Sequence, residues 1–186
     1  MQNIQLYSNL KYIDNVGKNF PVFAGSFPNA IVHIGATAFA NATFADDTNI
    51  NLSRLAEVGE MAFKGSDIQM VNFGDNTSLN DIPEECFAEC NGLQSVANAN
   101  SSIKNVGQKA FYNCNTLSSF DFNDITSFGA SSFYDVQIAN IDLENAIKVG
   151  DRAFENNIAL TSLTCSKDML NSENLGTQVF YRCNNI

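Results

Sequence analysis

The chain has 186 residues, 45% of them hydrophobic, and a formal net charge of −10 at pH 7. That length suffices for one domain with a sizeable core. Its ten lysine and arginine residues are scattered singly, whereas nucleic-acid binding needs clustered basic side chains. Nucleic acid and anionic membrane surfaces are therefore poor partner candidates, and we predict no nucleic-acid partner and no membrane insertion. No apolar run approaches the roughly 18 residues of a membrane span, and residues 1–15 lack the apolar core of a signal peptide.

Residues 1–33 are predicted to form an N-terminal cap. The segment VGKNFPVF, at 16–23, resembles a degenerate copy of a pattern that recurs through the rest of the chain, with Phe20 one place early and Pro21 interrupting it. Terminal units of a repeat array are commonly atypical because they shield the apolar core from water. The single histidine, His33, lies between apolar neighbours, and no acid or nucleophile stands at a spacing that indicates catalysis.

From residue 34 onward, one pattern recurs at a near-constant spacing. Its seven copies are IGATAF (34–39), VGEMAF (58–63), IPEECF (82–87), VGQKAF (106–111), FGASSF (128–133), VGDRAF (149–154) and LGTQVF (175–180). The final phenylalanines of successive copies are 24, 24, 24, 22, 21 and 26 residues apart. Such periodicity indicates a repeat architecture. Residues 34–186 are therefore predicted to form seven repeat units of about 21–26 residues, the last one incomplete.

Each unit contains one short extended segment of the form apolar-x-x-apolar-x-apolar. Its last three positions alternate as in a strand with one buried face; in LSSFDF (117–122), Phe120 and Phe122 point inward and Asp121 points outward. The segment LQSVAN (93–98) loses the third apolar position. Stacked units place these strands side by side as a parallel sheet, about 4.7–4.9 Å apart. Segment 42–52 contains a two-residue insertion, and its acids Asp46 and Asp47 are predicted to lie in a loop.

The V-G-x-x-A-F segment is predicted to be a compact turn opposite the strands. Apolar residues at its first, fifth and sixth positions suit about one turn of helix, and each phenylalanine is predicted to stack on the next in an interior ladder. The recurring glycine occupies one structural position, which predicts a role in a turn or in close packing. No G-x-G-x-x-G or G-x-x-x-x-G-K-[ST] phosphate-binding motif is present.

The combined pattern L-x-x-I-x-L, a spacer and I-G-x-x-A-F-x-x-C resembles the BspA-type leucine-rich repeat, which is found in surface proteins of bacteria and some protists. The resemblance covers about residues 20–186, although Asn123 follows a strand where the family often has proline. It implies a repeat solenoid, a right-handed superhelix with a parallel concave β-sheet and short helical turns on the convex side. It also implies adhesion or ligand binding without enzymatic activity.

Five cysteines occupy predicted interior positions: Cys86, Cys90, Cys114, Cys165 and Cys183. A buried free cysteine behaves as a small hydrophobic residue. Two alternatives stay open, a metal site at the Cys86-x3-Cys90 pair and a disulfide between Cys90 and Cys114. Structural zinc normally needs four Cys or His ligands, but the chain has no second such pair and one histidine. We predict no metal, no cofactor and no catalytic residue.

The outward-pointing strand residues are the candidate partner-binding residues of the concave face. They are Met70, Asn72, Ser95, Ser119, Asp121, Asn140, Asp142, Ser162 and Thr164. Asp121 and Asp142 occupy equivalent positions on neighbouring strands, about 5 Å apart if the register holds. Paired carboxylates can bind calcium or act as acid and base; the alternatives are a partner-binding stripe and a solvated polar face.

The final segment LGTQVFYRCNNI (175–186) stops where another strand is expected. This predicts truncation of a longer array, or end-to-end contact with further repeats or another chain. An extended array also offers a broad binding surface. The sequence therefore predicts a non-enzymatic binding or adhesion module of a cell-surface or secreted protein, which recognises protein or glycan. The alternative is a structural spacer or assembly component, for example virion-associated, joined through its open C-terminal end.

Overall fold

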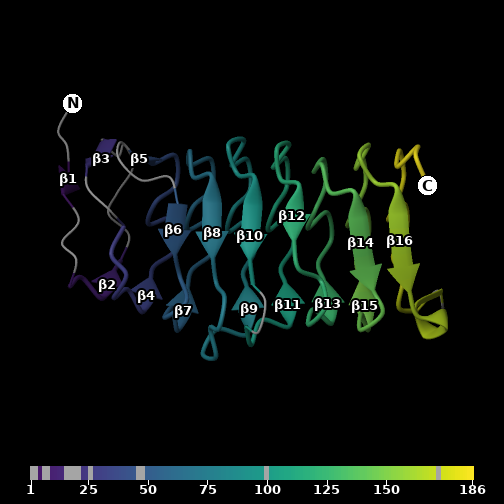
Figure 1. Ribbon diagram of the computed structural model, residues 1–186, viewed down its shortest axis with the longest axis horizontal. Coiled ribbons are helices and arrows are strands. Elements are labelled where there is room, and N and C mark those ends of the chain that lie inside the picture. Colours follow the sequence, from purple (N-terminus) through teal and green to yellow (C-terminus); the bar gives the residue numbers. More distant parts are fainter. Residues whose placement is uncertain are drawn as a thin grey trace.

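The repeat units are stacked into a solenoid. The computed structural model describes residues 4–5, 9–14, 22–24, 27–44, 49–98, 101–170 and 173–186. Successive units follow one another along the long axis of the molecule, from β1 (Ile4–Gln5) near one end to β16 (Ser162–Cys165) near the other (Figure 1). All strand pairs are parallel, as stacked copies of one unit require. The predicted parallel-strand solenoid is confirmed.

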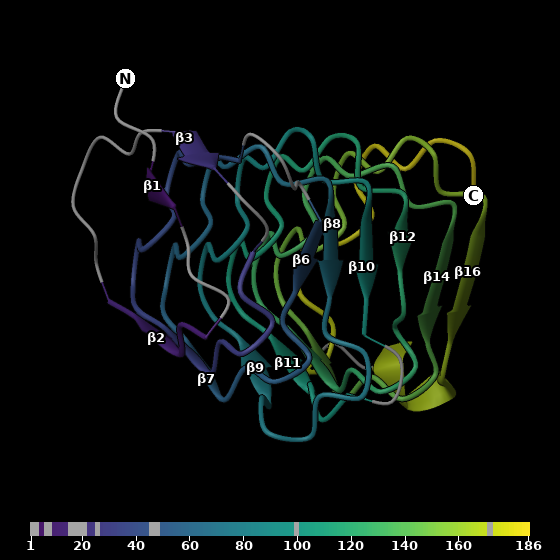
Figure 2. The same ribbon diagram turned by 60° about the vertical axis from the view of Figure 1, so that its left-hand side comes forward.

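One side of the stack carries the strands that the sequence predicted. A four-stranded sheet has the order β6, β8, β10, β12, and the pair β14 and β16 follows it along the stack (Figures 1 and 2). The bounds are β6 Asn49–Asn51, β8 Met70–Asn72, β10 Ser95–Ala97, β12 Ser119–Phe120, β14 Asn140–Leu143 and β16 Ser162–Cys165. We call the outward side of these six strands the strand face. β6 lies within the segment that the sequence analysis assigned to an insertion, and it continues this sheet.

A second set of short parallel strands was not predicted. Six of its strands lie at the two residues before the glycine position of the pattern, which Pro83 fills after β9, and β2 precedes Asp14. The set consists of β2 Tyr12–Ile13, β4 His33–Ile34, β7 Glu57–Val58, β9 Asp81–Ile82, β11 Asn105–Val106, β13 Ser127–Phe128 and β15 Lys148–Val149. The set divides between β7 and β9. In most units the N–H of the glycine donates to a carbonyl of the preceding unit; Gly107, for example, donates to the Ile82 carbonyl at 2.7 Å. After β9, Pro83 takes the place of this glycine. Proline has no N–H to donate.

The described N-terminal residues belong to the same stack. β1 pairs with β3 (Val22–Ala24), which pairs with β5 (Thr43–Phe44), and β2 pairs with β4. Phe27 is buried, and its ring lies 5.5 Å from that of Phe39. The boundary of the cap at residue 33 stays a prediction. Segment 16–23 lies largely outside the described residues, as do Asp46 and Asp47.

The side opposite the strand face consists of hydrogen-bonded turns rather than the expected turns of helix. We define the turn segment of a unit as the six residues from three before the final phenylalanine of the pattern to two after it, for example 108–113. Lys109 and Asn113 have positive φ values of 53° and 56°, and residues at the same two positions do so in every unit. Alternating conformations prevent a helix. The only helix in the described residues is the 3-10 helix Lys167–Leu170.

The core is built around a ladder of phenylalanine rings, as predicted. Rings of successive units stack with centroids 5.0–5.6 Å apart and planes within 21°. The six earlier rings are fully buried: Phe39, Phe63, Phe87, Phe111, Phe133 and Phe154. Inward strand residues such as Val71 and Ile141 complete the core, each about 1% exposed.

The recurring glycine is required by close packing of one unit on the next. A Cβ at Gly129 would lie 2.4 Å from the backbone nitrogen of Gln108, and one at Gly176 would lie 2.4 Å from that of Asp151. Neither glycine has a positive φ. The close-packing role that the sequence left open is therefore the one that the structure shows at these positions.

Candidate functional site

The strand face presents two parallel rows of side chains. The first row contains Asn49, Met70, Ser95, Ser119, Asn140 and Ser162. The second row contains Asn51, Asn72, Ala97, Asp121, Asp142 and Thr164. Register places Met70 opposite both Asn49 and Ser95, and Asn140 opposite Ser162. All nine sequence-predicted candidates therefore lie in these rows, and each is exposed or partly exposed.

Asp121 and Asp142, which the sequence placed at equivalent positions of neighbouring strands, are not joined by strand pairing among the described residues. Asp142 pairs with Thr164 of β16, whereas β12 ends at Phe120, one residue before Asp121. No strand pairing joins β12 to β14 among the described residues. A carboxylate pair about 5 Å apart stays a prediction.

Several side chains of the second row fold the turn that follows their own strand. The Oδ1 atoms of Asn51, Asn72, Asp121 and Asp142 each accept the backbone N–H two residues later, at 2.8–3.0 Å. This is the Asx-turn geometry, which asparagine and aspartate adopt equally well. One carboxylate oxygen of each aspartate is thus committed to the fold.

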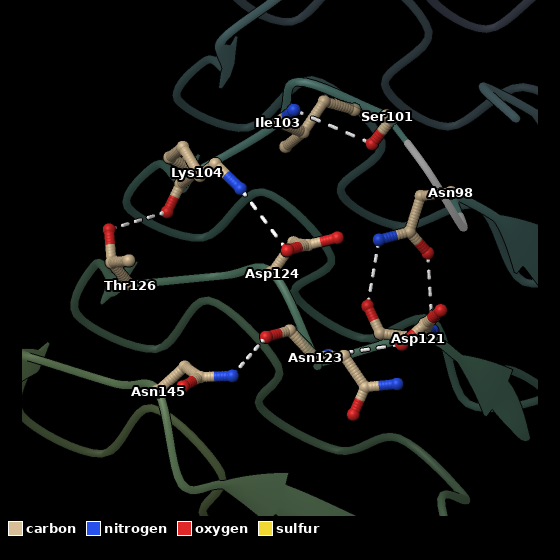
Figure 3. Close-up of polar contacts among 9 residues, drawn as sticks. All are labelled: Asn98, Ser101, Ile103, Lys104, Asp121, Asn123, Asp124, Thr126 and Asn145. Carbon is tan, nitrogen blue, oxygen red and sulfur yellow. Dashed lines mark hydrogen bonds and ion pairs between the residues drawn. The ribbon is translucent and has the colours of Figure 1, made fainter. Parts of the chain in front are cut away.

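Around Asp121, side chains link neighbouring units (Figure 3). Asn98 takes the place of the lost third apolar residue and is buried. Its amide donates to the Asp121 carbonyl at 2.7 Å and accepts the Asp121 N–H at 3.1 Å. Asn145 donates to the Asn123 carbonyl at 2.6 Å. A buried amide is tolerated because it is hydrogen-bonded, so this exception to the apolar pattern holds adjacent units in place.

The chemistry of the strand face is hydrogen bonding. Its rows combine hydroxyl and amide side chains with two carboxylates, one alanine and the exposed Met70, and they contain no basic side chain. Sequence reasoning missed Asn49 and Asn51 because it assigned their segment to an insertion. The alternation of N-I-N-L at 49–52 is the signal that identifies them as strand residues.

Four of the five cysteines are buried, as their positions predicted, whereas Cys165 is partly exposed. All five are free. Cys90 and Cys114 donate their thiol protons to the carbonyls of Phe63 and Phe87 in the preceding unit, both at 3.0 Å. Burial raises the pKa of the Cys90 thiol to about 11 and that of the Cys114 thiol well above its usual value. Because the thiolate is the nucleophile, these sulfur atoms are unreactive at neutral pH.

His33 joins neighbouring units of the second set of strands. Its Nδ1 lies 3.0 Å from Oε2 of Glu57, and its Nε2 lies 3.1 Å from Oδ1 of Asp14. The three side chains lie close together because β4 pairs with β2 on one side and with β7 on the other. In the described part of the chain, no group of three or more His, Cys, Asp or Glu side chains is arranged to hold a metal ion. Among the same residues, no helix is long and apolar enough to span a membrane.

Comparison with known proteins agrees with this architecture. A family model for the BspA type leucine rich repeat region, in six copies, matches residues 1–79, 24–124 and 76–186, which together cover the whole chain. The chain belongs to this family. None of the curated proteins is similar enough in sequence to count as a relative.

Two crystal structures of leucine-rich repeat proteins share the fold. A protein from Bacteroides ovatus matches 99% of this chain with a TM-score of 0.67 and 21% identity. The match covers 47% of that protein, so this chain spans about half its length. A protein from T. pallidum matches 89% of this chain and 77% of its own, with a TM-score of 0.54 and 17% identity. At these identities the likeness concerns the fold alone.

Proposed function

We propose that this BspA-family chain is a non-enzymatic recognition module that binds a protein or a glycan through the strand face, as part of a cell-surface or secreted protein. The observation that carries the proposal is the pair of rows described above. Side chains that donate and accept hydrogen bonds repeat in register from β6 to β12 and from β14 to β16, and Asn72, Ser119, Asn140 and Ser162 are exposed.

The composition of the rows favours a polar ligand. Hydroxyl and amide groups both donate and accept hydrogen bonds, which suits the backbone of a protein loop or the hydroxyls of a sugar. Solenoids use such extended surfaces for binding. The carboxylates of Asp121 and Asp142 add negative charge, so a ligand with a positive or hydroxyl-rich surface fits better than an anionic one.

The test compares two serine-to-arginine variants, one on the strand face and one on the second set of strands. Wild-type chain is screened on arrays of glycans and of immobilised extracellular proteins, and affinities for any hit are then measured for Ser119→Arg and Ser127→Arg. Ser119 lies on the strand face, whereas Ser127 is the equivalent outward residue of β13 in the second set of strands. We expect Ser119→Arg to weaken binding at least tenfold and Ser127→Arg to leave it unchanged. Equal affinity of the two variants contradicts the proposal.

A further inference from the structure

Asn91 and Gly92 form the only asparagine–glycine pair in the sequence. They are the central residues of a turn that the N–H of Leu93 closes by donating to the Cys90 carbonyl at 3.0 Å. Asn91 is exposed and Gly92 is partly exposed, whereas Cys90 and Leu93 are fully buried. The turn therefore holds an accessible asparagine between two core residues, just before β10.

The two groups of this pair that can react with each other are not engaged elsewhere. Among the described residues, the side-chain amide of Asn91 has no hydrogen-bond partner, and the N–H of Gly92 meets no acceptor. The buried Asn98 differs, because its side-chain amide donates at 2.7 Å and accepts at 3.1 Å. The side-chain carbonyl carbon of Asn91 and the backbone nitrogen of Gly92 are thus free to meet.

The space around Gly92 permits the rotation that brings these two atoms together. A Cβ at Gly92 would lie 3.4 Å from its nearest atom, the Ile68 carbonyl oxygen, whereas a Cβ at Gly129 would lie 2.4 Å from a backbone nitrogen. Glycine also has the widest choice of backbone conformations. The peptide group between Asn91 and Gly92 can therefore turn without displacing the neighbouring unit.

We propose that Asn91 is a site of spontaneous deamidation in the folded protein. The backbone nitrogen of Gly92 loses its proton and attacks Cγ of Asn91; the new C–N bond closes a succinimide ring, and the side-chain nitrogen leaves with the proton as ammonia. Water then opens the ring. Breaking the bond to Cγ gives aspartate, and breaking the bond to the backbone carbonyl carbon gives isoaspartate. Water is the only co-reactant.

The products change the turn in two ways. Either one adds a negative charge, and isoaspartate also places its β-carbon in the backbone between Cys90 and Leu93. The hydroxyl of Thr116 donates to the Asn91 and Leu93 carbonyls at 2.9 and 2.8 Å, so the added backbone atom displaces these bonds to the next unit. Isoaspartate is therefore expected to destabilise the chain around β10, which carries Ser95 of the strand face.

The next repeat unit contains a matched control. Asn115 occupies the position of Asn91, is exposed, and follows Cys114 as Asn91 follows Cys90. Its side chain also has no hydrogen-bond partner among the described residues. The residue after it is Thr116, whose branched side chain restricts the backbone. The two sites therefore differ chiefly in the residue that supplies the attacking nitrogen.

The test is incubation of the folded full chain at neutral and at mildly alkaline pH, followed by protease digestion and mass spectrometry. We expect amide-to-acid conversion at least tenfold faster at Asn91 than at Asn115, and faster at the higher pH because the attacking nitrogen must lose its proton. Isoaspartate is detected by enzymatic methylation of its carboxylate. Equal conversion at the two asparagines overturns the proposal. So does an unchanged Asn91 in the folded chain after a period in which the urea-unfolded chain is converted.

Variants at Gly92 and Thr116 identify the attacking nitrogen. Gly92→Ala is expected to slow conversion of Asn91 at least tenfold, and Thr116→Gly is expected to make Asn115 a second site. Conversion of Asn91 at an unchanged rate in Gly92→Ala contradicts the mechanism. Asn91→Asp carries the added charge without the added backbone atom, so we expect its Tm to exceed that of the isoaspartate form. A Tm of the isoaspartate form equal to that of the unmodified chain contradicts the predicted displacement of the turn.

Discussion

At the scale of single residues, the aspartates of the strand face serve the fold as well as the surface. Oδ1 of Asp142 accepts the N–H of Glu144 at 2.9 Å, and Asn72 holds the N–H of Gly74 in the same way at 2.8 Å. A substitution to alanine at such a position has two effects at once: it removes a side chain that could contact a ligand, and it removes the acceptor that stabilises the turn. Asparagine separates the two effects, because it removes the charge and keeps the acceptor.

We therefore expect Asp142→Ala to lower the free energy of unfolding by about 1 kcal/mol, the usual value of one hydrogen bond. Asp142→Asn is expected to change it by less than about 0.5 kcal/mol, since Asn51 and Asn72 close their turns with the same atom. Urea denaturation followed by circular dichroism measures both. If the two variants are equally destabilised, the charge of Asp142 matters to the fold and the Asx turn does not explain it.

At the scale of elements, the sequence predicted which residues are inside but not the backbone that places them there. The buried faces of β8 and β14 and the phenylalanine ladder follow from alternation and spacing alone. The turn segments do not: Met61, Glu85 and Lys109 share a positive φ and share no side-chain chemistry. The left-handed conformation costs about 1–2 kcal/mol per residue, and it is favoured here by hydrogen bonds to the next unit, which no local pattern encodes.

The positions of the candidate residues on the strand face could be predicted from alternation along each strand. Outward strand positions follow from the period of two, so the nine candidates lie where expected. What the sequence did not predict is that Asp121 lies beyond the end of β12 and is fixed through Asn98, because that link depends on one exception to the apolar pattern. The second set of strands was also missed, since two residues such as Asn105–Val106 are too short to show a period.

The recurring glycine allows a direct test of how closely the elements pack. Gly129→Ala places a Cβ 2.4 Å from backbone nitrogen, whereas Gly92→Ala meets its nearest atom at 3.4 Å, and neither residue has a positive φ. Overpacking against rigid backbone costs about 1–3 kcal/mol, so we expect that loss for Gly129→Ala and a change within about 0.5 kcal/mol for Gly92→Ala. Thermal and urea unfolding measure both. A destabilised Gly92→Ala beside an unaffected Gly129→Ala contradicts close packing as the reason for the glycine.

At the scale of the whole molecule, stability depends on contacts between neighbouring units. Every strand pairs with the unit before or after it, and the phenylalanine ladder has one ring per unit. In each of the six earlier turn segments, three backbone N–H groups donate to carbonyls of the next unit. In such an array, stability is the sum of unit and nearest-neighbour terms. An inner unit is therefore expected to be interchangeable with its neighbours.

Removal of one whole unit tests this interchangeability. Deletion of residues 88–111 joins Phe87 to Tyr112, which brings β12 beside β8, β13 beside β9 and the ring of Phe133 onto that of Phe87. We expect a folded chain with an unchanged circular dichroism spectrum and cooperative unfolding, whose Tm falls by about 2–4 °C for each kcal/mol lost. Deletion of residues 88–99, half a unit, is the control: it puts each later strand opposite a turn, so we expect it to unfold the chain. A folded half-unit deletion beside an unfolded whole-unit deletion would show that the repeat period does not determine how these units pack.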